Sequence, residues 1–201
     1  TRLSGGKDCA QARYIHTKLS PITYKLFDTK DNPIYDYTED DGLPVEPVYY
    51  VPTLPMLLIN GTSGIGTGWS TEIPSFNPTD IIKNIKNMLN GQEYKEMIPY
   101  YRNFKGTIEY ATDTNGTILD NTFKTNGKYT IEGTKTGDKL TITELPVGIW
   151  TDTYKEYLEK LMNDKKSIKY YNSYCTDVDV HFEIFLTDQL QYSPAKLLEK
   201  T

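Results

Sequence analysis

The sequence predicts an α+β fold, because helical and strand patterns occupy separate stretches of the chain. One apolar stripe with helical spacing runs along residues 77–89, and a second follows Thr151. Between them lie short runs in which apolar and polar residues alternate, separated by Asn-Gly turns at 115–116 and 126–127. With 201 residues, of which 37% are hydrophobic and 24% charged, the chain is suited to form packed cores.

The first part of the chain predicts a short helix followed by an acidic turn region. Asp8 is a candidate N-cap for a helix over residues 9–19, which Pro21 would end. Residues 28–47 are acidic and contain proline and glycine, so we expect a loop or a weak hairpin. The pattern is already under way at Thr1, with no initiator methionine, which favours a piece of something longer.

The second part carries the clearer signals. Asn77 is expected to cap the helix of residues 77–89, Pro78 takes its first helical position, and Asn90-Gly91 ends it. Thr151 is expected to cap a second helix, and a domain boundary is expected between residues 55 and 76. Strands are predicted at about 106–111, 117–123, 128–132, 139–145 and 178–186.

Charge is unevenly distributed along the chain. A formal net charge of −5 argues against a grip on nucleic acid over the whole surface. Residues 1–20 nevertheless hold four basic side chains and one acidic, whereas residues 28–46 hold seven acidic and one basic. The first stretch is suited to phosphate contact and the second would repel it, although solvated surface is the simple alternative for both.

Several function classes find no support. Cys9 and Cys175 lack the C-x-x-C spacing of a zinc site, and two histidines do not make a three-histidine metal centre. No apolar run reaches the roughly 18 residues that a membrane helix needs. His16 and His181 are best interpreted as structural residues, with His181 a strand residue that faces water. We therefore expect a soluble intracellular protein with no metal ligands in these residues.

A glycine-rich turn at residues 60–70, with the sequence NGTSGIGTGWS, is the first candidate site. It lacks the lysine of a phosphate-binding loop and the third glycine of a dinucleotide fingerprint. Its glycines allow close approach of the backbone to a bulky partner and isolate Ile65. Ile65 either anchors the turn in the core or acts as an apolar wedge between base steps of DNA.

Arg13 and Tyr14 are the second candidate. A phenolic hydroxyl ionises only near pH ~10 in water, so a tyrosine nucleophile needs a cation or metal beside it. An arginine neighbour is always charged and binds the non-bridging oxygens of a phosphodiester. The Arg-Tyr dipeptide alone is weak evidence for catalysis, because a tyrosine beside a basic residue, such as Tyr24-Lys25, arises by chance among 17 tyrosines.

Six blocks in one order resemble the breakage-reunion region of type IIA DNA topoisomerases, of the eukaryotic or large-DNA-virus kind. The resemblance runs from residue 1 to about 186 and is weakest over residues 110–140. The blocks are TRLSGGKDCAQARYIHTKLSP, VEPVYYVPTLPMLLINGTSGIGTGWST, IPSFNPTDIIKNI, NFKGTIE, ITELPVGIWTDTYKEYLEKLM and YCTDVDVHFEI.

The resemblance implies roles for particular residues. Tyr14 matches the tyrosine that becomes linked to the 5′ phosphate of DNA, Arg13 the neighbouring arginine that stabilises the transition state, and Ile65 the isoleucine that bends the duplex. Basic residues are expected to contact DNA: Arg2, Lys7, Lys196 and Lys200. Ala12 and His16 depart from the proline and phenylalanine that many relatives carry there, which leaves Arg13 and Tyr14 in place.

The resemblance also implies a division of the chain and a set of partners. Residues 1–70 would be the C-terminal part of a winged-helix domain and residues 71–201 an incomplete tower domain. The intact enzyme would be a homodimer that binds double-stranded DNA in the nucleus or another DNA-containing compartment. Its Mg²⁺ and ATP would be bound outside these residues, so the chain alone is expected to be inactive. A DNA-bending module without chemistry and a purely structural interaction domain are the alternatives.

Overall fold

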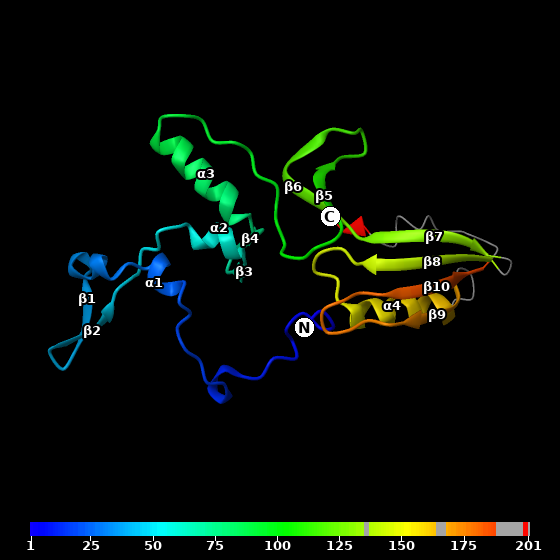
Figure 1. The fold of residues 1–201 in the computed structure, drawn as a ribbon, viewed down its shortest axis with the longest axis horizontal. Coiled ribbons are helices and arrows are strands. Elements are labelled where there is room, and N and C mark those ends of the chain that lie inside the picture. Colours follow the sequence, from blue (N-terminus) through cyan, green and yellow to red (C-terminus); the bar gives the residue numbers. More distant parts are fainter. Residues whose placement is uncertain (135–136, 164–167, 188–198, 201) are drawn as a thin grey trace. The chain divides into compact units, whose positions relative to one another are not determined.

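The computed structural model describes all residues except 135–136, 164–167, 188–198 and 201, and divides the chain into two compact units. One unit is formed by Ala12–Tyr100. The other joins Thr1–Gln11 to Tyr101–Thr201, so the first residues of the chain pack with its second half. Both units contain helices and strands (Figure 1), which makes this a mixed α and β structure.

The Ala12–Tyr100 unit consists of short elements connected by irregular chain. Two antiparallel hairpins, β1–β2 and β3–β4, form separate two-stranded sheets, and α3 is the one helix of more than two turns among the described residues of this unit. The elements in order are η1 (Ala12–Tyr14), α1 (Thr23–Leu26), η2 (Thr29–Ile34), β1 (Tyr37–Asp40), β2 (Leu43–Pro47), α2 (Met56–Asn60), β3 (Thr62–Gly66), β4 (Trp69–Ile73) and α3 (Pro78–Leu89).

Helix α3 forms for the reasons that the sequence gives. The side chain of Asn77 accepts a hydrogen bond from the backbone N–H of Thr79 at 2.9 Å, and Pro78 occupies the first turn, so both predictions are confirmed. The helix buries Ile81 and Asn84. The Asn84 amide donates to the carbonyl of Lys95 and accepts from its N–H, which holds the following loop against the helix.

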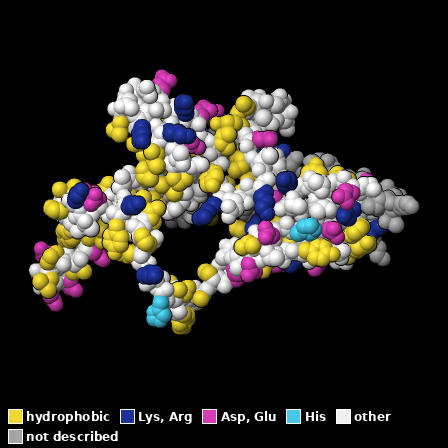
Figure 2. Space-filling view, viewed as in Figure 1, with side chains coloured by type: hydrophobic (Ala, Val, Ile, Leu, Met, Phe, Trp, Pro, Cys, Tyr) yellow, Lys and Arg dark blue, Asp and Glu magenta, His cyan; other side chains and the backbone are white. Residues whose placement is uncertain are grey.

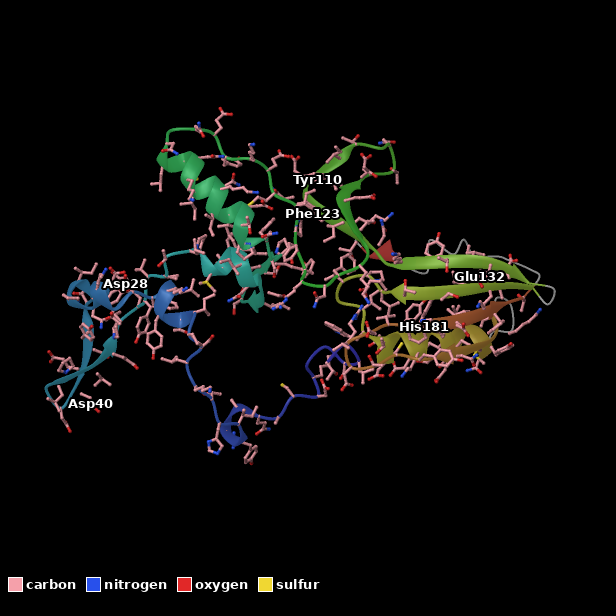
Figure 3. The ribbon with its side chains drawn as sticks, viewed as in Figure 1. Asp28, Asp40, Tyr110, Phe123, Glu132 and His181 are labelled. Carbon is pink, nitrogen blue, oxygen red and sulfur yellow. The ribbon has the colours of Figure 1, made fainter. Side chains whose placement is uncertain are left out.

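The helix expected over residues 9–19 does not form. Only the single 3₁₀ turn of Ala12–Tyr14 is helical there. Every residue of the segment is exposed, and isolated helices of this length are marginal in water, so no packing offsets the entropy of ordering it. The acidic stretch of residues 28–47, by contrast, contains the expected hairpin. Figure 2 shows acidic side chains gathered at its tip, where Figure 3 labels Asp40.

The unit containing Tyr101–Thr201 is built on an antiparallel sheet with the order β7-β8-β10-β9, against which α4 packs (Figure 1). A second sheet has the order β11-β6-β5, with a cross-strand pair of Tyr110 and Phe123 whose ring centroids are 5.0 Å apart (Figure 3). The elements are β5 (Thr107–Thr112), β6 (Ile118–Asn126), β7 (Lys128–Thr134), β8 (Gly137–Glu144), α4 (Thr151–Asn163), β9 (Ile168–Ser173), β10 (Phe182–Leu186) and β11 (Glu199–Lys200).

The predicted strands of this unit are present with boundaries shifted by a few residues, and β9 and β11 are additional to them. Helix α4 is present as expected, but Thr151, the predicted cap, is its first helical residue, and the Thr151 hydroxyl donates to the carbonyls of Arg2 and Leu3 at 3.5 Å. His181 lies one residue before β10 and is half-buried, with its ring against that of Tyr174 at 5.5 Å. The expectation that His181 is a strand residue facing water is therefore wrong, because the connection from Tyr174 folds back over it.

The core of this unit lies between the sheet and α4. Strands β8 and β10 are central, and every second residue along them points inward, which is the alternation that the sequence shows. The buried cluster consists of Leu140, Ile142, Leu145, Tyr154, Leu158, Ile168, Val180, Phe182, Ile184 and Leu186.

Truncation of a side chain to alanine is expected to lower the free energy of unfolding strongly only at the centre of this core. Ile184→Ala removes a side chain that is fully buried in β10 and should lower the free energy of unfolding by about 2–5 kcal/mol. Ile131→Ala is the matched control, because Ile131 lies on edge strand β7 with 48% of its surface exposed. Urea unfolding of both variants measures the difference, and equal losses would contradict this placement of the core.

Candidate nucleic-acid interface

Arg13 and Tyr14 are the last two residues of the 3₁₀ turn Ala12–Tyr14, and both are exposed. The turn is closed by a hydrogen bond from the N–H of Ile15 to the carbonyl of Ala12 at 3.2 Å. Tyr14 keeps 76% of its surface open to solvent. A phenol held in this way is accessible to a large partner, and the guanidinium of its neighbour is free to approach the same phosphate.

Ile65 lies near the tip of the β3–β4 hairpin, one pair away from the two-residue turn of Thr67 and Gly68. It faces Ser70 across the hairpin, and 95% of its surface is exposed. The alternative that Ile65 anchors the turn in the core is therefore wrong. Trp69, on the other strand, is exposed to 84%. Two large apolar side chains thus project from one glycine-rich hairpin.

Hydrogen bonds connect the chain segments at the base of the hairpin. Ser75 donates its hydroxyl to the carbonyl of Asn60 at 2.9 Å, and the N–H of Phe76 donates to Leu58 at 2.8 Å. Gly61 starts the hairpin with a φ of 69°, and a Cβ there would lie 2.7 Å from the carbonyl oxygen of Ile73. Only glycine fits this position without strain.

Lys7 belongs to the other unit, as do Arg2 and Lys200, so the predicted site residues are shared between the two units. Lys7 is exposed and follows a turn in which its N–H donates to Ser4 at 3.4 Å. The neighbouring Asp8 accepts a hydrogen bond from the Thr1 hydroxyl at 2.8 Å, which lowers the pKa of its carboxyl. Lys200 lies on β11, paired with Thr125 of β6. Lys196 lies outside the described residues.

Arg2 has a different environment from the one expected of a DNA contact. Its guanidinium is 3.0 Å from the carboxylate of Glu144 and donates to the carbonyl of Ile149 at 2.6 Å. Only 18% of its side chain is exposed. A guanidinium occupied in this way is not free to neutralise a phosphate, so Arg2 is a structural residue of this unit. The sequence carries no signal for this contact, because Glu144 is 142 residues away.

The described residues offer no metal-binding cluster of three or more His, Cys, Asp and Glu side chains. Asp179, whose spacing from Asp177 has the letters of a metal motif, pairs with Lys105 at 3.0 Å. Among the described helices, none is long and apolar enough to cross a membrane.

Comparison with known proteins places this chain in a defined class. A solved structure of the topoisomerase II DNA-binding, cleavage and re-ligation domain from Plasmodium falciparum matches all of the chain and 27% of that structure, with a TM-score of 0.84 and 39% identity. DNA topoisomerase 2 of Drosophila melanogaster is 47% identical over 92% of the chain, and that of Arabidopsis thaliana is 43% identical over 94%. The class is therefore that of type II DNA topoisomerases.

The family model of the DNA gyrase/topoisomerase IV A-subunit matches residues 1–201, and the chain belongs to this family. The resemblance drawn from the sequence is confirmed. The chain spans 12% of the length of the Drosophila relative and 13% of the Arabidopsis relative.

The geometry at Gly61 predicts how the Ile65 hairpin responds to substitution. Gly61→Ala introduces a Cβ into a left-handed backbone position against Ile73, and should cost about 1–3 kcal/mol at the base of the hairpin. Gly64→Ala is the control, because a Cβ at Gly64 meets open space. Amide hydrogen exchange of β3 and β4 should accelerate only in Gly61→Ala, and equal exchange in the two variants would contradict this interpretation of the hairpin.

Proposed function

We propose that this chain is part of an ATP-dependent type II DNA topoisomerase, which cleaves both strands of a duplex transiently, passes a second duplex through the break and rejoins the ends. The observation that carries the proposal is the open ring of Tyr14, directly beside an exposed Arg13, in a chain of this family. A tyrosine sealed in a core would have been incompatible with attack on a double helix.

The proposed reaction at Tyr14 is a transesterification. The phenolic oxygen attacks the phosphorus of a DNA phosphodiester, forms a bond to it and loses its proton. The bond from phosphorus to the 3′ oxygen breaks, and that oxygen takes up a proton to become a free hydroxyl. Arg13 stabilises the charge that develops on the non-bridging oxygens. Because the 5′-phosphotyrosine bond conserves the energy of the phosphodiester, rejoining is the reverse exchange and needs no cofactor.

Ile65 is proposed to act as a wedge between base steps of the cleaved duplex. An exposed branched side chain on a narrow hairpin is the type of group that unstacks a step and kinks DNA. Unstacking costs a few kcal/mol per step, which the wider contact of a bent duplex offsets. The acidic β1–β2 hairpin would face away from the phosphates, because its charge repels them.

The remaining parts of the proposed enzyme lie outside the described residues. We propose that Mg²⁺ and ATP are bound by parts of the intact enzyme outside this chain. The chain alone would then be inactive. We further propose that residues 1–70 belong to a winged-helix domain and residues 71–201 to a tower domain, that the enzyme is a homodimer on double-stranded DNA, and that it works in the nucleus or another DNA-containing compartment. Contact of Lys196 and Lys200 with DNA stays a prediction.

The nucleophile is tested by Tyr14→Phe in the intact subunit. Removal of the hydroxyl should abolish the covalent protein–DNA adduct trapped by denaturation, while the duplex still binds. Tyr24→Phe is the matched control, because Tyr24 is also an exposed tyrosine beside a basic residue of the same unit, and it should leave adduct formation unchanged. An adduct that persists in Tyr14→Phe would exclude Tyr14 as the nucleophile.

Duplex binding discriminates the proposal from a purely structural domain. Lys7→Ala should reduce the slope of log affinity against log salt by about 1, since one phosphate contact is lost. Ile65→Ala should reduce the bend angle measured by energy transfer between labelled DNA ends, with little change in the salt slope. If both variants bind and bend DNA as the unmodified protein does, the structural alternative holds; bending without any adduct would favour a module that has lost the chemistry.

A further inference from the structure

Thr1–Gln11 and Tyr101–Thr201 form one unit, here named the strand-rich unit. Polar contacts around Arg2 fix the first residues of the chain within it. Its guanidinium donates to the carboxylate of Glu144 and to the carbonyls of Leu145 and Ile149, and lies 5.4 Å from the ring centre of Trp150. Its backbone N–H donates to the carbonyl of Asp177 at 2.7 Å. We refer to Arg2, Gly5, Glu144 and Trp150 as the Arg2 anchor.

The anchor also completes helix α4. The N–H groups of Thr151 and Asp152, at the start of α4, donate to the carbonyls of Arg2 and Leu3 at 3.4 and 3.1 Å. The first N–H groups of a helix have no partner within the helix, so the N-terminal segment caps α4 with its backbone. Opening of the anchor would therefore leave these two amides without their partners.

Gly5 lets the segment lie directly on Trp150. It has a φ of 67°, and a Cβ at this position would overlap the indole ring. No residue of Thr1–Gln11 is fully buried, so the segment contributes no apolar core of its own. The segment is fixed by the hydrogen bonds of Arg2 together with the close approach of Gly5 to Trp150.

Glu144 takes part in the Arg2 anchor but not in the apolar core of the unit. Its side chain is 9% exposed and accepts hydrogen bonds from Arg2, from the N–H of Lys105 and from the N–H of Leu145. Burial of such a pair gains little stability over apolar residues of the same volume, while loss of one partner is costly. The buried cluster under α4 is complete without it.

We propose that Arg2 is a positioning residue for the reaction assigned above to Tyr14. Seven Cα–Cα steps lead from Gly6 to Arg13, a span of at most about 25 Å. The 3₁₀ turn that they reach is exposed and closed by one local hydrogen bond. The place where Gly6 is held thus limits the volume that Arg13 and Tyr14 sample. This inference rests on the proposed function, because it concerns how the nucleophile is presented to DNA.

The test uses the paired variant Arg2→Leu/Glu144→Leu in the intact subunit, which removes both charges and leaves no buried ion unpaired. Amides of Thr151 and Asp152 should exchange at least tenfold faster, with the β8 and β10 amides unchanged. The rate of adduct formation at saturating duplex should fall about 10–100-fold, because small misplacement of a reacting group has effects of this size. Duplex affinity should change less than threefold, since the net charge is conserved. Arg2→Lys keeps the positive charge but loses the guanidinium group, which donates to several acceptors at once, so this variant should cleave at an intermediate rate.

Lys139→Ala is the matched control. Lys139 pairs with Glu132 and Glu183 on the same sheet, so its loss perturbs the unit without touching the anchor, and cleavage should be unchanged. Wild-type cleavage by the paired variant, unchanged exchange at Thr151 and Asp152, or a rate that falls only in proportion to affinity would each overturn the inference. If the unmodified subunit forms no adduct, the proposed function fails instead, and the exchange experiment still reports on the anchor.

Discussion

Backbone hydrogen bonds between distant segments hold the Ala12–Tyr100 unit together, and the exposure of its functional side chains depends on them. The N–H of Thr53 donates to Leu26 at 2.7 Å, that of Phe76 to Leu58 at 2.8 Å, and that of Tyr100 to Ser75 at 2.7 Å. These bonds close loops across the unit, which also contains edge-to-face contacts of Tyr50 with Phe27 and Tyr35. Tyr14 and Ile65 lie on exposed turns of this unit, with 76% and 95% of their surfaces open to solvent.

The strand-rich unit is instead held together by an apolar core. Its sheet and α4 share a continuous core, in which Tyr154 is buried between Phe182 and Tyr157 and burial raises the pKa of its hydroxyl. The stability of this unit comes mainly from apolar burial, which ions do not screen as they screen pairs of surface charges. The unit is thus a suitable base on which polar segments such as Thr1–Gln11 are fixed.

The sequence predicts those features that depend on local pattern. Helix α3 and the strands of the second half are predictable because their apolar period and their capping or turn residues lie within a few positions of one another. The helix expected over residues 9–19 is wrong because cap and stop signals do not suffice for a helix of this length, which needs packing against other elements, and all of these residues are exposed. Strand β9 escapes prediction because its partner β10 defines it, and that pairing is not visible in the segment itself.

At the candidate site, the role of Tyr14 can be predicted from local sequence and the role of Arg2 cannot. The motif around Tyr14 is contiguous, so a resemblance identifies it, and the structure adds only that the ring is open. Ile65 is ambiguous in sequence, because a glycine-flanked isoleucine suits a core anchor as well as an exposed wedge, and only the hairpin register decides. The charge of Arg2 alone suggests DNA contact, since its partner Glu144 is brought to it by the fold.

The segment that carries Tyr14 has to be exposed to reach DNA and also has to be held in place to react. A group that meets a duplex has to stay out of the protein's core, and a group without burial gains no precision from its own packing. The precision must then come from neighbours along the chain that are fixed, and Arg2 is fixed by the polar contacts of the anchor. A buried ion pair is a poor source of stability, and the gain that we propose for it here is one arrangement of the backbone around Arg2. On this argument the Glu144 pair is retained for the geometry that it defines, and the separate apolar core supplies the stability of the unit.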